Sequence, residues 1–374
     1  MSARSVSRFV LAATTLAFVF TASSAAQHST AKPSRGGADH KARQARPIQL
    51  GVSGGNAGDI ANGYCCSGTL GALVTDGQRQ YILSNTHVFA GDAVTGGNGK
   101  VAKVGDDINQ SGLIDVGCQV IAGDMVADLT DWAPFGNGNV DAAIAQVRSG
   151  QVRTDGAILE IGPVANTTAQ AFVGQAVKKS GRTSGLTRSA VSALNATINV
   201  GYTDECAGNS FTVQYQGQIM ISNRGSRFLA GGDSGSVMFE DVTVNPRAVG
   251  LLYAGSSSVA VANPIGDVLD YFNVTMVGGA ASAGTGTPDE SGPGSRRGLA
   301  AAIAAQGRNS RALMNVPGAV GHAVGTGASP VLKVLVTEIT PRAQAAAPRQ
   351  IEGFPVVLEE VGDVRGMPFC SRRR

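Results

Sequence analysis

Residues 231–236 read Gly-Gly-Asp-Ser-Gly-Ser, and they form the stretch with the clearest capacity for chemistry. Glycines on both sides of the Asp233-Ser234 pair allow the backbone to turn tightly around one displayed hydroxyl. A serine hydroxyl attacks a carbonyl carbon only when a nearby base accepts its proton and N–H groups stabilise the oxyanion that forms. Ser234 is therefore the candidate nucleophile, and it needs a base.

The candidate base is a histidine, because imidazole accepts a proton near neutral pH. The chain has four histidines. His28 and His40 lie in what reads as an N-terminal leader region, and His322 follows a long Gly/Ser/Pro linker. His87 ends the apolar, strand-like stretch 81–87 where a loop begins, so it is the candidate general base. The alternative is a histidine that only satisfies hydrogen bonds in the core.

Two aspartates are candidates for orienting His87. Asp141 follows a Gly-Asn loop at 136–139 and precedes the strand-like run 142–147, which places it at a rigid strand entrance. Asp115 is the weaker alternative. The chain order His, Asp, Ser is that of chymotrypsin and differs from the order in subtilisins and α/β-hydrolases. The serine motif also lacks the Gly-x-Ser-x-Gly pattern of the latter. A lipase-like reading is therefore disfavoured.

The chain resembles the trypsin/chymotrypsin-like serine proteases at these residues, and it is more similar to their bacterial, alpha-lytic-protease-like branch. The closer resemblance rests on residues 177–186, which look like the hairpin that opens the second barrel of those enzymes. Residues 66–70 are similar to the strand before the catalytic histidine. The chain also resembles secreted bacterial trypsin-like proteins with a small extra C-terminal domain. The resemblance runs from about residue 47 to residue 275.

The resemblance implies an all-β fold. Two six-stranded antiparallel Greek-key barrels would be followed by a linker and a small α+β C-terminal domain. Ser234 would form an acyl-enzyme with a polypeptide substrate, His87 would transfer protons, and Asp141 would hold the useful tautomer of the imidazole. Backbone N–H groups of Gly232 and Ser234 would form the oxyanion hole.

Two further roles follow from the same resemblance. Asp233 is expected to be buried beside the nucleophile, and a buried carboxylate needs a partner. In the alpha-lytic relatives the hairpin arginine supplies it, so we expect an ion pair between Asp233 and Arg182; the alternative is an exposed Arg182. The expected lining of the specificity pocket is Phe228, Leu229, Tyr253 and Gly255. Because none of these carries a carboxylate, we expect an uncharged, small or medium apolar side chain before the cut.

Length and composition predict more than one folding unit. A chain of 374 residues exceeds what one core normally holds. Its 51 glycines, with short Val/Ile/Thr/Ala runs between turn residues, favour strands over helices. The predicted division is a signal peptide at 1–26, a flexible lead-in at 27–46, a protease domain at 47–275, a linker at 276–297 and a domain of unknown role at 298–374.

The first 26 residues are typical of an export signal. Arg4 and Arg8 precede an apolar run, and small residues suited to cleavage follow up to Ala26. The apolar run is too short to span a bilayer comfortably, and a retained anchor is the alternative. We therefore expect a secreted or periplasmic protein without stable membrane insertion after signal cleavage.

Export makes disulfides plausible for five cysteines. They are Cys65, Cys66, Cys118, Cys206 and Cys370. Five is odd, so at least one thiol is free or pairs between chains, and the connectivity does not follow from the sequence. The histidines are scattered, and neither His-Glu-x-x-His nor paired Cys-x-x-Cys spacing occurs, so no metal and no cofactor are expected.

Short-range patterns predict individual elements. Residues 73–83 are typical of a hairpin with an Asp-Gly turn. Apolar side chains spaced by three to four residues indicate a helix over 264–272, and 299–313 also looks helical. Strands are predicted at 330–336 and 354–358. The final three arginines are interpreted as a solvated tail.

The net charge of +3 is small and the positive residues are scattered, which argues against a nucleic-acid partner. The sequence favours a secreted serine endopeptidase that hydrolyses polypeptides. Two alternatives stay open: a pseudoprotease that uses the same fold as a binding scaffold, and an esterase or other acyl hydrolase. Turnover of an amide against an ester would discriminate the last two activities.

Overall fold

We describe the chain from a computed structural model. The structure describes residues 37–91, 101–203, 206, 208–223, 228–281, 296–327, 329–367 and 369–372. The predicted signal peptide and most of the predicted linker lie outside the described residues. Among the helices of the described ranges, none has the length and apolar character needed to cross a membrane.

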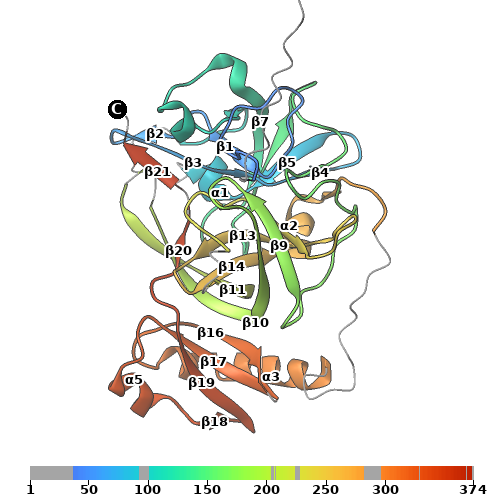
Figure 1. Ribbon diagram of the computed structural model, residues 1–374. Coiled ribbons are helices and arrows are strands. Elements are labelled where there is room, and N and C mark those ends of the chain that lie inside the picture. Colours follow the sequence, from blue (N-terminus) through green and yellow to red (C-terminus); the bar gives the residue numbers. More distant parts are fainter. Residues whose placement is uncertain are drawn as a thin grey trace, which may run out of the picture. The chain divides into compact units, whose positions relative to one another are not determined.

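The first sheet contains β5, which precedes His87 in the chain, and β8, which follows Asp141. It is the upper sheet in Figure 1. Its strands pair in the order β15-β4-β5-β8-β7-β6-β1-β3-β2, and β21 pairs with β3. The bounds are β1 Val52–Asn56, β2 Ile60–Ala61, β3 Tyr64–Leu70, β4 Ala72–Thr75, β5 Gln80–Ser84, β6 Asp107–Asn109, β7 Met125–Trp132, β8 Ala143–Val147, β15 Thr275–Met276 and β21 Phe369–Arg372.

The second sheet follows the order β11-β14-β13-β12-β9-β10-β16-β17-β19-β18, with β20 beside both β10 and β13. The bounds are β9 Ala176–Gly181, β10 Gly185–Thr203, β11 Ser210–Ser222, β12 Val237–Glu240, β13 Ala248–Gly255, β14 Val259–Pro264, β16 Ala319–Thr326, β17 Pro330–Val336, β18 Gln350–Ile351, β19 Phe354–Glu360 and β20 Arg365–Gly366. The long strand β10 pairs along its length with β9, β11 and β16.

Helices are few and short. They are α1 Thr86–Phe89, α2 Ile265–Phe272, α3 Arg296–Arg308, α4 Ser310–Met314 and α5 Pro341–Ala346, with 3₁₀ turns at Leu113–Val116 and Ala122–Asp124. The helix predicted over 264–272 is α2, whose Ile265, Val268 and Leu269 are buried. The single helix predicted over 299–313 is instead two helices, because the chain turns at Asn309.

The predicted hairpin shows how local sequence sets the first sheet. Strands β4 and β5 pair through a turn at Asp76-Gly77, where Gly77 has a φ of +91°. The Asp76 carboxylate accepts hydrogen bonds from the N–H groups of Gln78 and Arg79 at 2.8 and 2.7 Å and from the Tyr81 hydroxyl at 2.8 Å. These donors, led by the Arg79 N–H, lower the pKa of Asp76 to about 2.

The fold class expected from the sequence is confirmed. The structure is mostly β, with two sheets that correspond to two chymotrypsin-like β-barrels. Each core consists mainly of small and branched apolar side chains, as alternating strand patterns require. Strands β16, β17 and β19 follow α3, and β16 pairs with β10 of the second barrel.

The lead-in predicted at 27–46 is wrong for its described part. His40 is buried, its Nδ1 lies 2.8 Å from the carbonyl oxygen of Gly51, and its Nε2 lies 2.6 Å from Glu160. The buried His40 therefore ties residues 37–46 to the start of β1 and to the segment that connects β8 with β9. The remaining domain boundaries stay predictions.

The C-terminal segment leaves β19 and returns to the barrels. In Figure 1 its red chain passes through β20 to β21. Strand β20 pairs antiparallel with β13 of the second sheet, and β21 pairs antiparallel with β3 of the first. One short segment therefore contacts both barrels. In the first it pairs with β3, which precedes His87 in the chain, and in the second with β13, which follows Ser234.

Candidate active site

His87 and Asp141 form a buried hydrogen-bonded pair. His87 lies on α1, directly after β5, and Asp141 lies two residues before β8. The Nδ1 atom of His87 is 2.6 Å from Oδ2 of Asp141, and the backbone N–H of His87 points to Oδ1 at 3.3 Å. The exposed fractions are 5% for His87 and 0% for Asp141, so water does not compete for the pair.

Neighbouring side chains hold this pair in place. Asn85 donates a hydrogen bond to the carbonyl oxygen of Asp141 at 2.7 Å, and the Thr86 hydroxyl donates to the carbonyl oxygen of Ala142 at 2.9 Å. The backbone N–H of Asp141 donates to Oδ1 of Asn263 on β14 at 3.0 Å. The backbone of Asp141 is thus tied to elements of both barrels.

Tyr202 on β10 belongs to the candidate site and was not predicted from the sequence. Its hydroxyl donates to Oδ2 of Asp141 at 2.8 Å. Burial, followed by the negative charge of Asp141, raises the pKa of Tyr202 well above its usual value, so the hydroxyl stays a donor. No local pattern marks a tyrosine on a strand 61 residues from its partner.

Ser234 lies on a turn that only glycines permit. Gly232 and Gly235 have φ values of +93° and +91°. A Cβ at Gly235 would stand 2.2 Å from the carbonyl oxygen of Thr69 and 2.3 Å from the Ser84 hydroxyl. The backbone N–H of Thr69 donates to the carbonyl oxygen of Ser234 at 2.8 Å, which fixes the turn against β3.

The Ser234 hydroxyl donates to the carbonyl oxygen of Tyr253 at 3.1 Å. In the described part of the chain, Nε2 of His87 is buried and has no hydrogen-bond partner. Gly68 separates the two elements: a Cβ there would lie 2.6 Å from Val88 and 2.9 Å from the carbonyl oxygen of Ser234. The structure thus gives the His-Asp hydrogen bond but directs the serine hydroxyl to a backbone carbonyl.

The predicted ion pair between Arg182 and Asp233 is wrong. Asp233 pairs with Lys179, whose Nζ lies 3.2 Å away, and both side chains are fully buried. Asp233 also accepts the N–H groups of Thr183 and Ala230 at 2.8 and 2.9 Å and the Ser184 hydroxyl at 2.5 Å. The turn after Arg182 thus offers backbone donors to Asp233, while the cation comes from β9. Burial lowers the pKa of Lys179, and the charge of Asp233 opposes that shift.

Arg182 instead pairs with Asp115, the residue considered as a second carboxylate for His87. The guanidinium makes two hydrogen bonds to this carboxylate, at 2.8 and 2.6 Å, and Ser53 donates a third at 2.5 Å. Both charged side chains are at least nine-tenths buried. Asp115 is therefore committed to Arg182, and Asp141 is the carboxylate that contacts His87.

Of the residues expected to line the specificity pocket, Tyr253 contacts Ser234 through its carbonyl oxygen. Phe228 and Leu229 belong to a buried apolar cluster. The backbone of Leu229 is held by Asn223, which contacts its N–H at 2.8 Å and its carbonyl oxygen at 3.1 Å. A Cβ at Gly255 would lie 3.0 Å from Leu229, and Tyr253 is fully buried.

The C-terminal segment contacts the turn that carries Ser234 and the strand β13 that follows it. The backbone N–H of Gly232 donates to the carbonyl oxygen of Met367 at 2.7 Å, and the N–H of Met367 donates to the carbonyl oxygen of Tyr253 at 3.2 Å. The Met367 side chain packs against the cluster that contains Phe228 and Leu229. A donor expected to bind an oxyanion therefore already holds a peptide carbonyl.

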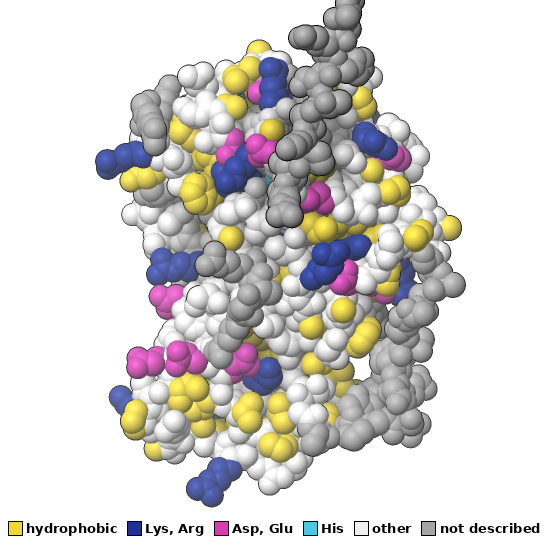
Figure 2. Space-filling view, in the orientation of Figure 1, with side chains coloured by type: hydrophobic (Ala, Val, Ile, Leu, Met, Phe, Trp, Pro, Cys, Tyr) yellow, Lys and Arg dark blue, Asp and Glu magenta, His cyan; other side chains and the backbone are white. Residues whose placement is uncertain are grey.

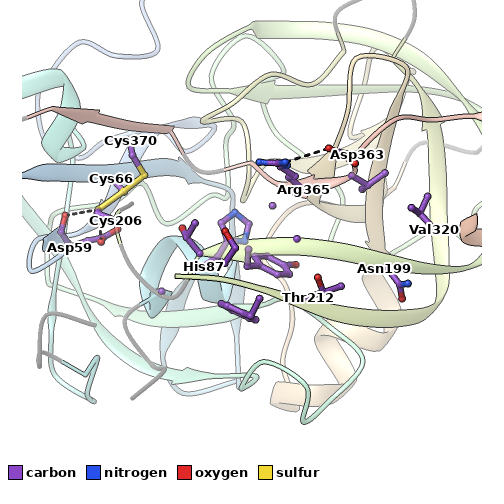
Figure 3. A pocket seen from close by; sticks show the side chains of 18 residues that line it. Asp59, Cys66, His87, Asn199, Cys206, Thr212, Val320, Asp363, Arg365 and Cys370 are labelled. Carbon is purple, nitrogen blue, oxygen red and sulfur yellow. Dashed lines mark hydrogen bonds and ion pairs between the residues drawn. A yellow bond between two sulfur atoms is a disulfide. The ribbon is translucent and has the colours of Figure 1, made fainter. Parts of the chain in front are cut away.

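His87 lines a cavity of about 480 Å³ (Figure 3). Tyr202 and Phe211 line it together with the C-terminal segment, and Cys66, Cys206 and Cys370 gather at one end beside Asp59. The three sulfur atoms lie within 4.8 Å of one another, and this is the group among the described residues that could hold a metal ion. Elsewhere, Cys65 and Cys118 form a disulfide.

Comparisons with known proteins point to proteases. A family model described as the Nal1 C-terminal domain matches residues 132–263. Glutamyl endopeptidase 2 of Streptomyces griseus is 30% identical over 112 residues, which are 30% of this chain and 52% of that protein. The chain thus spans about half the length of this curated relative.

Solved structures with a similar fold include a glutamic acid specific serine protease that uses a histidine triad in substrate binding, at 20% identity and a TM-score of 0.41. It matches over 61% of this chain and 100% of that one. Protease A of Thermobifida fusca is 16% identical, with a TM-score of 0.42, over 62% of this chain and 99% of that one. The chain resembles the bacterial chymotrypsin-like serine proteases.

Proposed function

We propose that the protein is a serine endopeptidase in which Ser234 is the nucleophile, His87 the general base and Asp141 the residue that orients His87. One observation carries the proposal: the buried 2.6 Å contact between His87 and Asp141 occurs together with a glycine turn that carries Ser234 and whose Gly232 N–H binds a peptide carbonyl. A nucleophile, an oriented base and an oxyanion donor are the parts that acyl transfer needs.

The proposed reaction begins with a substrate carbonyl oxygen at the N–H groups of Gly232 and Ser234. Rotation about the Cα–Cβ bond of Ser234 moves its hydroxyl from Tyr253 to Nε2 of His87, which accepts the proton as Oγ attacks the carbonyl carbon. The imidazolium then protonates the leaving amine, and water hydrolyses the ester with His87 again as base. Asp141 and Tyr202 keep the imidazole in the tautomer that carries hydrogen on Nδ1.

The pocket chemistry supports an uncharged side chain before the scissile bond. The named relative is a glutamyl endopeptidase, and a solved relative uses a histidine triad in substrate binding. In this chain His40 is bound to Glu160, and His322 is bound to Gln306 and Ser310. Cleavage after an acidic residue is therefore not proposed.

The proposed substrate is a polypeptide outside the cytoplasm. A disulfide between Cys65 and Cys118 suits an oxidising compartment, in keeping with the predicted export signal. On the face shown in Figure 2, lysine and arginine side chains are scattered among acidic ones and do not form one basic patch. This face therefore gives no support to a nucleic-acid partner.

The test compares a peptide amide with the matching ester. The expected result is hydrolysis of both by the wild-type protein, with loss of both in Ser234→Ala. Ester turnover alone would point to the acyl hydrolase, and no turnover in a folded protein whose cleft has been opened would point to the binding scaffold. The variants that open the cleft are those that displace the C-terminal segment.

A further inference from the structure

We propose that residues 364–367 and 369–372 are an internal peptide ligand that fills the substrate cleft, with Met367 as the residue whose carbonyl faces Ser234. The proposal rests on the proposed function and names its substrate class. The site then takes an extended peptide in which glycine precedes a long, unbranched apolar residue at the bond that is attacked.

The backbone register carries the first step. Gly366 is paired with Ala254 and Arg365 with Gly255, in an antiparallel ladder that extends β13. A strand added to an exposed sheet edge is a common way to bind a peptide, because main-chain hydrogen bonds fix it independently of sequence. The ladder ends where the carbonyl oxygen of Met367 accepts a hydrogen bond from the N–H of Gly232. We therefore place the carbonyl carbon of Met367 as the one that Ser234 would attack.

The side chain of Met367 carries the second step. It packs against the apolar cluster that includes Phe228, Leu229 and Leu252. Methionine is flexible and apolar, so it fills such a pocket without needing a polar partner. A carboxylate or a guanidinium in the same place would be buried without a counter-charge, which is strongly unfavourable.

The ring of Tyr202 determines which residue type can precede Met367. A Cβ on Gly366 would lie 2.5 Å from Cε1 and 2.6 Å from Cδ1 of the Tyr202 ring. The ring cannot move away freely, because its hydroxyl is bound to Asp141 and it packs on Phe135 and Phe211. Glycine is therefore required at this position of any peptide that follows the same path.

The other half of the segment continues across the first barrel. Strand β21 pairs antiparallel with β3, with Cys370 opposite Cys66. The Phe369 ring lies 5.0 Å from the guanidinium of Arg182. A tethered strand has an effective concentration of about millimolar, so it competes well with free peptides even when each contact is weak.

The experiment displaces the strand in the full chain by two independent changes. Gly366→Val drives a side chain into Tyr202, and Met367→Asp places a charge in the apolar pocket. Asp363→Ala is the control, because Asp363 lies just outside the segment and its side chain is 68% exposed. We expect hydrolysis of a Val-Arg-Gly-Met-Ala peptide to rise by about tenfold or more in both variants, and to stay at the wild-type rate in the control.

Three peptides test the substrate class in the opened variants. The Gly-Met peptide is expected to have at least about tenfold higher kcat/KM than its Gly-Glu or Val-Met counterparts. Preference for the Gly-Glu peptide, or an unchanged rate in both opened variants, would overturn the proposal.

Failure of the proposed function is separable from failure of this inference. A labelled Val-Arg-Gly-Met peptide is titrated into the double variant Ser234→Ala, Gly366→Val. Saturable binding that is lost with the Glu peptide supports the ligand proposal even if no variant hydrolyses anything. Equal binding of both peptides, or none, contradicts it.

A second observation, the cluster of three cysteines, carries an independent proposal. Cys66 is placed to form a disulfide with Cys206 or with Cys370, with Cα–Cα distances of 5.9 and 4.1 Å. One sulfur forms one disulfide, so the five cysteines leave one thiol. We infer that Cys66 exchanges between these two partners, and that the exchange ties or releases β21.

The exchange needs no added oxidant or reductant. The Cys206 thiolate attacks Sγ of Cys66, the Cys66–Cys370 bond breaks, and Cys370 leaves as a thiolate that takes up a proton. The proton of Cys206 leaves to solvent; its sulfur lies 2.9 Å from a carboxylate oxygen of Asp59. The number of disulfides is the same before and after.

Disulfide mapping of the alkylated full chain tests the exchange. With a catalytic amount of thiol, we expect both linked peptides in the wild type, and a shift toward Cys66–Cys206 when the Val-Arg-Gly-Met peptide is added. Cys370→Ser should raise peptide binding or hydrolysis by about tenfold over Cys206→Ser, which locks the strand. A single pairing that no peptide shifts, or a metal ion retained by three reduced cysteines, contradicts the inference.

Discussion

The hydroxyl of Tyr202 lies 2.8 Å from Oδ2 of Asp141, the same oxygen that accepts the hydrogen bond from His87. Asp141 lies two residues before β8 of the first sheet and Tyr202 lies on β10 of the second, so this contact joins the two barrels at the carboxylate. The same tyrosine ring faces Gly366 of the C-terminal segment. One side chain therefore contacts both the candidate orienting carboxylate and the C-terminal segment.

Replacing Tyr202 by Phe removes a donor from Asp141 and leaves the ring in place. In the opened Gly366→Val chain we expect kcat to fall about tenfold with little change in KM, since a hydrogen bond to a charged group contributes on the order of 1.5 kcal/mol or more. Tyr215→Phe is the control, because its hydroxyl contacts Tyr202 at 3.3 Å and not the carboxylate. Equal kcat in the two variants would remove the positioning role.

Two glycines with the same backbone angle separate strain from steric overlap. Gly235 and Gly77 both have φ of +91°, but a Cβ at Gly77 meets nothing within 4 Å. Gly77→Ala is expected to cost on the order of 1 kcal/mol of unfolding free energy. Gly235→Ala should cost several times more or prevent folding, because its Cβ would overlap Thr69 and Ser84. Urea unfolding measures both, and similar values would mean that the turn is less constrained than described.

The pair of Arg182 and Asp115 is expected to stabilise the fold although it is not at the reacting atoms. Asp115→Asn leaves a buried guanidinium without its counter-charge, at a cost of about 3 kcal/mol or more. Arg153 and Asp155 form a comparable pair with both side chains about 45% exposed. Asp155→Asn should therefore cost less than about 1 kcal/mol. The prediction is contradicted if thermal unfolding shows equal losses.

Because of His322, the free energy of unfolding is expected to depend on pH. Burial lowers the pKa of His322 to about 4 from 6.5. Its Nδ1 lies 2.7 Å from the amide nitrogen of Gln306, which donates to it, and its Nε2 lies 2.7 Å from Ser310. The folded state therefore keeps the ring neutral while the unfolded state takes up a proton below pH 6.5. Stability should be constant with respect to this group above pH 6.5 and fall by about 2 to 3 kcal/mol between pH 6.5 and 4.

The measurement is urea unfolding of the wild type and of His322→Gln over that pH range. Other groups titrate in both proteins, so the difference between the two curves isolates this histidine. A constant difference from pH 7 to pH 4 would show that the ring is protonated in the folded state.

Several features were predictable from the sequence because their signals are local. The hairpin of β4 and β5 follows from its Asp-Gly turn, α2 from its apolar spacing, and β17 from a run of apolar residues at 330–336. Gly232 and Gly235 likewise predict a tight turn at Ser234, because their positive φ values favour glycine over other residues. In each case the physical cause lies within about ten residues.

Other features depend on contacts between distant residues. Two acids, Asp115 and Asp233, and two cations, Lys179 and Arg182, are interchangeable as sequence signals, and only the geometry of the hairpin decides which pairs form. The segment after residue 360 has no strand periodicity. Its path depends on edges of β13 and β3 that lie more than 100 residues away.

The central claim is that Ser234 is a nucleophile activated by His87. The direct measurement is labelling by a fluorophosphonate probe in the Gly366→Val chain, alone and combined with Ser234→Ala or His87→Ala. The account predicts one labelled site, mapped to Ser234 by mass spectrometry, and loss of labelling in both combined variants. Labelling that persists in Ser234→Ala, or a folded Gly366→Val chain that binds peptide but takes no label, would contradict it.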